Sequence, residues 1–362
     1  MSDYQILREA NSIQTLVDYI CANTERPCTI MEVCGTHTMS IARWGIKSML
    51  PDKIKLVSGP GCPVCVTDSS ALATAFALAE MPNIIFTCFG DMLRVPAGDM
   101  SLLQLKSAGH DIRMVLSPMD ALEIAINNPN REIIFFAVGF ETTAPLTAAT
   151  IELAASKKVT NFSILCAHKT MPAAICALLP GSAVDALLCP GHVAVVGGAN
   201  EFAFVPQRLG KPAAIAGFEP FDMLLAIAYL VKDIKNKQAH LYNCYPRAVE
   251  AGGNATAQAI LAKVFQPTDG IWRGLGLITN SCLGLRNEYS SFDAVQKFHP
   301  QSKGIKDNPR CICSTILRGE ANPEQCPLFA QSCTPQQPVG ACMVSSEGSC
   351  AAAYKYMRRK AQ

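Results

Sequence analysis

The stretch Arg131-Glu-Ile-Ile-Phe-Phe-Ala-Val138 is the clearest strand pattern in the chain. Its run of apolar, β-branched and aromatic residues is typical of a strand that is buried on both faces of a parallel sheet. A helix rich in Thr and Ala is predicted next, near Thr142–Ser156, and another strand near Phe162–Cys166. A strand, a helix and a strand in this order predict a βαβ unit, and hence an α/β fold.

The same alternation continues on both sides of this unit, which predicts parallel sheets covered by helices. Further buried strands are predicted near Thr29–Val33, Ile54–Val57, Ile84–Phe89, Ile112–Leu116, Ala186–Leu188 and Ala213–Ala216. Helices are predicted near Met39–Leu50, Ala71–Ala79, Pro118–Ile126, Phe221–Lys235 and Val249–Phe265.

Changes in composition divide the chain into three expected parts. The turn-forming sequence Asn127-Asn-Pro-Asn130 separates a first α/β unit, residues 1–128, from a second, residues 129–240. In the third part, residues 241–362, the end of the chain is rich in Cys, Pro, Gly and Gln, and six of the 17 cysteines lie in the last 52 residues. A segment with so few apolar side chains needs a bound metal or cluster to hold a fold.

Composition excludes several classes of protein. Of 362 residues, 49% are hydrophobic and 17% charged, which excludes a disordered chain. The 31 Lys and Arg residues balance 29 Asp and Glu, and Arg358-Arg-Lys360 is the only basic run, so we expect no nucleic-acid partner. No apolar stretch approaches the roughly 20 residues that span a bilayer, so we expect no membrane partner. Residues Met1–Glu9 lack the apolar region of a signal peptide, which predicts a cytoplasmic protein with reduced cysteines.

The segment Met31-Glu-Val-Cys34-Gly-Thr-His37 places a thiol where a predicted strand ends and a helix begins. Ligands of open α/β sheets bind at the carboxyl ends of strands, and a helix N-terminus shifts a thiol toward the thiolate. Cys34 is therefore a candidate metal ligand or catalytic thiol. His37 is a candidate second ligand, proton carrier or orienting group. Taken alone, such a pair is more often a buried core thiol and a hydrogen-bonded histidine.

The segment Ser58-Gly-Pro-Gly-Cys62-Pro-Val-Cys65 also follows a predicted strand and precedes a helix. Cys-x-x-Cys in this place is typical of thioredoxin-type sites, in which one thiol attacks and its neighbour resolves the mixed disulfide. The flanking glycines allow another group to approach the backbone closely. Half of a structural zinc site is the alternative, but the chain has no second Cys-x-x-Cys to complete it. A redox or metal function is favoured for Cys62 and Cys65.

The tail of the chain carries the third set of cysteines. Their spacing matches neither a zinc finger nor a common ferredoxin pattern. Soft thiolates in a reduced, irregular segment suit either an iron–sulfur cluster or zinc. Chemistry alone leaves open which four of the six tail cysteines bind the cluster or metal ion. The six are Cys311, Cys313, Cys326, Cys333, Cys342 and Cys350.

Three further motifs lie at predicted strand ends, where clefts form: Gly139-Phe-Glu141-Thr-Thr143, His168-Lys169 and Cys189-Pro-Gly-His192. Each alone is more often structural than catalytic. The chain contains no Walker loop, no GxGxxG and no Gly-x-Ser-x-Gly, which argues against nucleotide hydrolysis, dinucleotide redox chemistry and serine hydrolysis.

Together, these motifs resemble the HypD family of hydrogenase maturation factors. The resemblance extends from residue 31 to residue 350, which is nearly the whole chain. The matching segments are Glu32-Val-Cys34-Gly-Thr-His37-Thr, Gly59-Pro-Gly-Cys62-Pro-Val-Cys65, Gly139-Phe-Glu141-Thr-Thr-Ala-Pro145, Cys189-Pro-Gly-His192 and Cys342-Met-Val-Ser-Ser-Glu347-Gly-Ser-Cys350.

The resemblance implies a cytoplasmic scaffold on which the Fe(CN)2CO centre of [NiFe]-hydrogenases is assembled. The transient iron would be held between Cys34 and a thiolate of a small chaperone, HypC. A second partner, HypE, would deliver cyanide from a thiocyanate at its C-terminus. Cys62 and Cys65 resemble the redox-active thiols of the family.

The tail also resembles the family's [4Fe-4S] motif, so the expected fold is α/β with two parallel-sheet units and a C-terminal iron–sulfur domain. The resemblance implies that the cluster ligands are Cys311, Cys326, Cys333 and Cys350, although Cys313 and Cys342 also have counterparts in the family. We hypothesise that electrons pass from the cluster through Cys62 and Cys65 toward iron at Cys34. His37 would serve as a hydrogen-bond donor or proton source.

Two other functions are compatible with the residues. A stand-alone thiol–disulfide oxidoreductase would use Cys62 and Cys65, with a structural zinc tail, and would act on disulfide substrates without labile sulfide. A non-catalytic iron–sulfur interaction protein would use Cys34 only for docking. Its partner would still bind a Cys34→Ala variant, and no iron would be lost.

Overall fold

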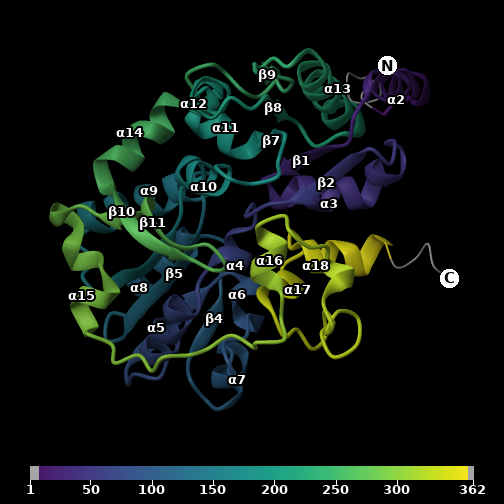
Figure 1. Ribbon diagram of the computed structural model, residues 1–362. Helices are drawn as coiled ribbons and strands as arrows, with labels where there is room; N and C mark the ends of the chain where they lie inside the picture. Colours follow the sequence, from purple (N-terminus) through teal and green to yellow (C-terminus); the bar gives the residue numbers. More distant parts are fainter. Residues whose placement is uncertain (1–7, 358–362) are drawn as a thin grey trace.

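A four-stranded parallel sheet forms around the strand that the sequence marks most clearly (Figure 1). The computed structural model describes residues 8–357. The strand β5 (Glu132–Gly139) alternates between two buried faces, because Ile134 and Phe136 enter one apolar core while Ile133 and Phe135 enter the other. This double burial explains its continuous hydrophobic sequence. The strand order is β4 (Ile112–Met114), β3 (Ile84–Cys88), β5 (Glu132–Gly139) and β6 (Phe162–His168).

A five-stranded parallel sheet forms the second layered unit. Two further apolar cores cover its faces: Met31 and Val57 face one core, and Ile30 and Leu56 face the other. The strand order is β2 (Ile54–Ser58), β1 (Cys28–Glu32), β7 (Ala186–Pro190), β8 (Ala213–Ala216) and β9 (Leu241–Asn243). The α/β class with two parallel sheets is therefore confirmed.

The sheets do not follow the expected division of the chain. β3 pairs with β5 across the boundary expected at residues 128 and 129, and β1 pairs with β7. Each sheet thus combines strands from 1–128 with strands from 129–240, and β9, from the expected third part, completes the five-stranded sheet. Hydrophobic patterns mark a strand but not its neighbour, which is selected by how the connecting segments pack in space.

Helices connect the strands and cover both sheets (Figure 1). Several begin at side-chain caps, such as Asp68 before α5 and the Ser117–Asp120 capping box of α8. The helices of this part of the chain are α2 (Ala10–Asn23), α3 (Gly35–Trp44), η1 (Ile46–Ser48), α4 (Pro63–Val66), α5 (Ser69–Ala79), α6 (Gly90–Arg94), α7 (Leu102–Ser107), α8 (Pro118–Asn127), α9 (Ala144–Ser156), α10 (Met171–Leu178), α11 (Gly191–Gly197), η2 (Ala199–Phe202), α12 (Phe204–Leu209) and α13 (Pro220–Asn236).

Beyond the five-stranded sheet, an antiparallel hairpin and a cysteine-rich segment complete the structure. The helix predicted from Val249 begins only at Ala255, because Gly253 adopts a positive φ and Asn254 provides the N-cap. The elements are α14 (Ala255–Val264), β10 (Phe265–Trp272), β11 (Gly276–Leu285), η3 (Asn287–Phe292), α15 (Ala294–Phe298), α16 (Cys313–Leu317), η4 (Pro323–Gln325), α17 (Ala341–Val344), α18 (Ser349–Ala352) and η5 (Ala353–Met357).

Two sequence-based expectations concern chain ends that the structure does not cover. The basic run 358–360 and most of the N-terminal segment 1–9 lie outside the described residues. No helix between residues 8 and 357 combines the length and the hydrophobicity needed to cross a bilayer.

Candidate functional site

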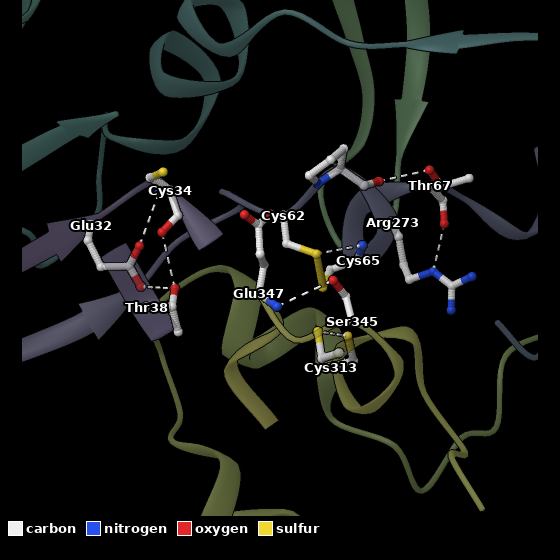
Figure 2. Close-up of a disulfide and its surroundings, with 12 residues drawn as sticks. Glu32, Cys34, Thr38, Cys62, Cys65, Thr67, Arg273, Cys313, Ser345 and Glu347 are labelled. Carbon is white, nitrogen blue, oxygen red and sulfur yellow. Dashed lines mark hydrogen bonds between the residues drawn. A yellow bond between two sulfur atoms is a disulfide. The ribbon is translucent and has the colours of Figure 1, made fainter. Parts of the chain in front are cut away.

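Cys34 lies in the turn that joins β1 to α3, at the carboxyl edge of the five-stranded sheet. Its backbone N–H donates to one oxygen of the Glu32 carboxylate over 3.0 Å (Figure 2). The Thr38 hydroxyl donates to the other oxygen over 2.5 Å. Because Glu32 is buried, these bonds are shielded from water, and the carboxylate ties the turn to the first residues of α3.

Burial determines the protonation of the Cys34 thiol. Loss of solvation raises its pKa to about 12, and the backbone N–H groups of His37 and Thr36 lower the pKa too little to offset this. The sequence predicted a thiol shifted toward the thiolate, and the structure reverses that expectation because the residue is only 7% exposed. A metal ion that binds this sulfur must therefore displace a proton.

His37 presents an uncharged ring to the same edge of the sheet. Its Nε2 contacts the carbonyl oxygens of Ala216 and Gly217 at 3.2 and 3.0 Å, and because carbonyls only accept, Nε2 carries the proton. Burial lowers the pKa of the ring to about 4, so it is neutral at pH 7. Nδ1 is buried and lacks a partner within residues 8–357. His37 is therefore a neutral hydrogen-bond donor to the backbone after β8, and its ring resists a second proton.

Cys62 and Cys65 form a disulfide at the start of α4, after β2. The placement between a strand and a helix agrees with the sequence prediction. The Cys65 N–H donates to the Cys62 sulfur over 3.2 Å. Both residues are almost fully buried, at 3% and 1% exposure. A large substrate therefore has little access to this disulfide.

Gly61 joins the Cys34 turn to the Cys62 loop. The N–H of Gly35 donates to the carbonyl oxygen of Gly61 over 2.8 Å. A Cβ on Gly61 would lie 2.2 Å from the backbone nitrogen of Cys34 and 2.5 Å from its Cα. Only glycine allows this approach, so the two cysteine sites hold each other in place.

Gly61→Ala is expected to displace the Cys34 turn. The added methyl group overlaps rigid backbone atoms, so we expect a loss of about 1–3 kcal/mol in the free energy of unfolding. We also expect faster alkylation of Cys34 in the native state. Chemical denaturation and peptide-resolved iodoacetamide labelling measure the two effects. Gly252→Ala is the control, because a Cβ there meets no atom within 4 Å, and equal behaviour of the two variants would contradict the prediction.

All six tail cysteines line one small, tightly packed space inside the C-terminal segment. Five of them are buried and Cys311 is partly exposed. The Cys333 sulfur accepts a hydrogen bond from the Val339 N–H over 3.3 Å. The sulfurs of Cys313 and Cys342 lie 2.7 Å apart and form a pair of their own.

This donor set fits an iron–sulfur cluster. Buried cysteine sulfurs with backbone N–H donors are the usual ligands of such clusters, and all six tail cysteines line this one space. Within residues 8–357, no three His, Cys, Asp or Glu side chains are placed around one metal ion.

The tail packs directly on the two other cysteine sites. α17, which contains Cys342, contacts α4, and α18 contacts α3 (Figures 1 and 2). The Thr36 hydroxyl donates to the Glu347 carboxylate over 2.7 Å, and the Glu347 N–H donates to the Ser345 hydroxyl. Cys62, Cys65, Cys313 and Cys342 belong to one apolar core, and the Cys34 turn adjoins it through Gly61.

The other strand-end motifs occupy different surroundings. His192 stacks on Phe218 at 4.0 Å between ring centroids, and Phe218 also contacts the ring of His37, which brings Cys189-Pro-Gly-His192 to the Cys34 edge. His168 is buried and hydrogen-bonds Thr147, and the Lys169 ammonium donates to the carbonyl of Ile271. These last two contacts stabilise the fold.

Sequence reasoning did not single out two residues that shape the site. Glu32 could have been identified from the sequence, because a charged residue inside an apolar strand needs a buried hydrogen-bonding partner. Nothing in the sequence pointed to Arg273. Its Nε donates over 2.9 Å to the carbonyl of Thr67, which is 206 residues away in the chain. Arg273 thus ties the hairpin to the segment after α4.

Comparisons with known proteins agree with this site. The HypD family model, described as "Hydrogenase formation hypA family", matches residues 10–357. The hydrogenase maturation factor HypD of Escherichia coli K12 is 41% identical over 361 residues, which cover 99% of this chain and 97% of that protein. HypD of Azotobacter vinelandii is 43% identical, covering 94% and 92%, and HypD of Cupriavidus necator is 44% identical, covering 91% and 90%. The chain therefore belongs to the HypD family of hydrogenase maturation factors.

Proposed function

We propose that this chain is the cytoplasmic scaffold on which the Fe(CN)2CO centre of [NiFe]-hydrogenases is assembled. Its family membership supports a role in hydrogenase maturation. The observation that carries the proposal is that the Cys62–Cys65 pair and the tail cysteines share one apolar core, while Gly61 packs on the Cys34 turn beside it. Their chemistry suits the holding of iron and the reduction of a ligand donor.

Iron is held as substrate between the Cys34 sulfur and a thiolate of a HypC-type chaperone. The Cys34 proton must leave to solvent or to the incoming partner when the iron binds. Glu32 and Thr38 keep the turn in place during this exchange. Thiolate ligands from two chains leave the remaining iron positions open for cyanide and CO.

Release of cyanide from a HypE-type thiocyanate needs two electrons. The dithiol of Cys62 and Cys65 supplies them: it closes to a disulfide while the sulfur–carbon bond of the thiocyanate breaks, giving a thiolate and cyanide. The pair must then be reduced again. Cysteines of the tail share the apolar core of the disulfide and are the nearest thiols that could reduce it.

The Cys313–Cys342 pair is placed to be that reductant, since α17 packs on α4. One of its thiolates attacks the Cys62–Cys65 disulfide and forms a mixed disulfide. The second thiolate resolves it, which leaves a Cys313–Cys342 disulfide and a reduced Cys62–Cys65 pair. Atoms and electrons balance for one turnover, and the next turnover needs two electrons from a reductant that reopens the Cys313–Cys342 disulfide.

Four tail cysteines, Cys311, Cys326, Cys333 and Cys350, would hold a [4Fe-4S] cluster, which supplies single electrons when bound. The stand-alone oxidoreductase is the less favoured function. Such an enzyme would use neither the Cys34 turn on which Gly61 packs nor the contact of the tail with the Cys62–Cys65 loop.

Metal analysis tests this division of roles. In protein purified alone without oxygen, we expect about four iron and about four acid-labile sulfide per chain. The Cys326→Ser variant should lose both, while Cys313→Ser should keep most of the iron. Zinc without sulfide in the wild-type protein would contradict the proposal and favour the oxidoreductase with a structural zinc tail.

A further inference from the structure

A lysine and a cysteine outside the three cysteine sites lie side by side on neighbouring segments. Lys169, which follows β6, pairs with Cys282 of β11 in an antiparallel bridge, and the N–H of Thr170 donates to the carbonyl oxygen of Ser281 over 2.8 Å. The Lys169 Nζ lies 3.8 Å from the Cys282 sulfur. Residues directly opposite each other in such a pair place their side chains on the same face. The backbone therefore fixes this contact between an amine and a thiol.

The Lys169 ammonium is held in place beside the sulfur. The side chain is only 3% exposed, and its Nζ donates to the carbonyl oxygen of Ile271 over 2.6 Å. Nζ also lies 5.4 Å from the centre of the Trp272 ring. An ammonium that is buried and anchored in this way stays near the sulfur, because it is not free to turn into solvent.

The Cys282 sulfur is confined as well, but a small oxidant can reach it. A Cβ on Gly270, in the opposite strand β10, would lie 2.0 Å from this sulfur, so the sulfur occupies the space that the missing side chain leaves. Cys282 itself is partly exposed, unlike the lysine. The reaction of a thiol with peroxide depends on such exposure. An oxidised Cys282 therefore forms with an amine already at contact distance.

We propose that Lys169 and Cys282 form an oxidative modification site, in which hydrogen peroxide joins the two side chains through a sulfur–nitrogen bond. Peroxide first oxidises the thiol to a sulfenic acid and releases one water molecule. The lysine gives its extra proton to water, and the neutral amine then attacks the sulfenic sulfur, which releases a second water molecule. The sulfur loses two electrons and the peroxide gains them. Two molecules of a small thiol reverse the reaction, restoring both side chains and ending as a disulfide.

The bond ties the β10–β11 hairpin to the end of β6. The nitrogen keeps one hydrogen, which can still donate to the carbonyl oxygen of Ile271. Farther along the hairpin, the N–H of Arg273 donates over 2.9 Å to the carbonyl oxygen of Val66, the residue after Cys65. The modification thus lies on the hairpin that contacts the end of α4. It shares no residue with the assembly chemistry proposed above and does not depend on it.

The test is peptide mass spectrometry of the full-length protein after treatment with hydrogen peroxide, with tryptic digestion in the absence of thiols. We expect cleavage after Lys169 to be lost. A cross-linked pair of peptides containing Lys169 and Cys282 should appear, lighter by two hydrogen atoms than the separate peptides together. Dithiothreitol should restore both the cleavage and the separate peptides. Because the measurement concerns these two peptides alone, oxidation of other cysteines does not affect it.

Four variants and a matched control separate the reaction from general oxidation. Cys282→Ser and Lys169→Arg should abolish the cross-link, since the first lacks the sulfur and the second lacks a nucleophilic amine. Cys21→Ser, at an exposed cysteine of α2, is the matched control and keeps the cross-link. Gly270→Ala leaves both reacting groups in place but displaces the sulfur. Its cross-link should form more slowly than in Gly304→Ala, where a Cβ meets no atom within 4 Å.

Cys166 is the competing partner for an oxidised Cys282. Its sulfur donates over 3.0 Å to the carbonyl oxygen of Leu283, the next residue along β11. A Cys166–Cys282 disulfide in the peroxide-treated protein would overturn the proposal. So would a Cys282 that ends as a sulfinic acid while trypsin still cleaves after Lys169. If Lys169→Arg fails to fold, Cys282→Ser still decides the result, because that residue is partly exposed.

Discussion

Replacing Cys34 by alanine is expected to abolish iron capture by the complex with a HypC-type chaperone. The sulfur of Cys34 is one of the two thiolates proposed to hold the iron, and no other cysteine lies in this turn. Without it, only the partner's thiolate remains, and the iron content should fall from stoichiometric to background. Iron analysis of the purified complex and the infrared bands of bound cyanide and CO measure the effect.

The control for this substitution is Cys21→Ala, at an exposed cysteine of α2, which should keep its iron. Copurification of the partner separates two explanations of a loss. If Cys34→Ala still binds the chaperone but carries no iron, the cysteine acts as a ligand. A complex that retains its iron in the variant would support the docking role of Cys34 and contradict the scaffold.

Replacing Cys62 by alanine should reduce hydrogenase maturation to background while the iron and sulfide content of the tail stays unchanged. Cys65 alone cannot close a disulfide within the loop, so it cannot supply two electrons to a thiocyanate. The substitution removes one buried sulfur and leaves Gly61 and the Cys34 turn in place. Cyanide release from a thiocyanate-carrying partner, measured in single turnover, reports the loss directly.

Cys313→Ser tests the same relay from its other end. In this variant Cys62 and Cys65 are intact, but their disulfide has no internal reductant, so it should stay oxidised in thiol-trapping experiments. Cys176→Ser, at a partly exposed cysteine of α10, is the matched control and should behave as wild type. Full maturation activity of Cys62→Ala would refute the relay.

The elements of the fold were largely predictable because local patterns specify them. The strand at 132–139 and the helix after it follow from apolar periodicity, and the Cys-x-x-Cys turn follows from its glycines. The grouping into sheets was not predictable. β1 finds its partner β7 more than a hundred residues away, because pairing depends on the packing of every intervening segment.

The sequence by itself determined the α/β class, the three sets of cysteines and the family resemblance, since each rests on residues that are close together in the chain. Only the tertiary structure decided how those sets combine. It places Gly61 on Cys34, pairs Cys313 with Cys342, and packs the tail on α3 and α4. It also decided protonation: burial outweighs the helix N-terminus at Cys34 and leaves His37 neutral. Solvation depends on what the rest of the chain covers, and no local pattern carries that information.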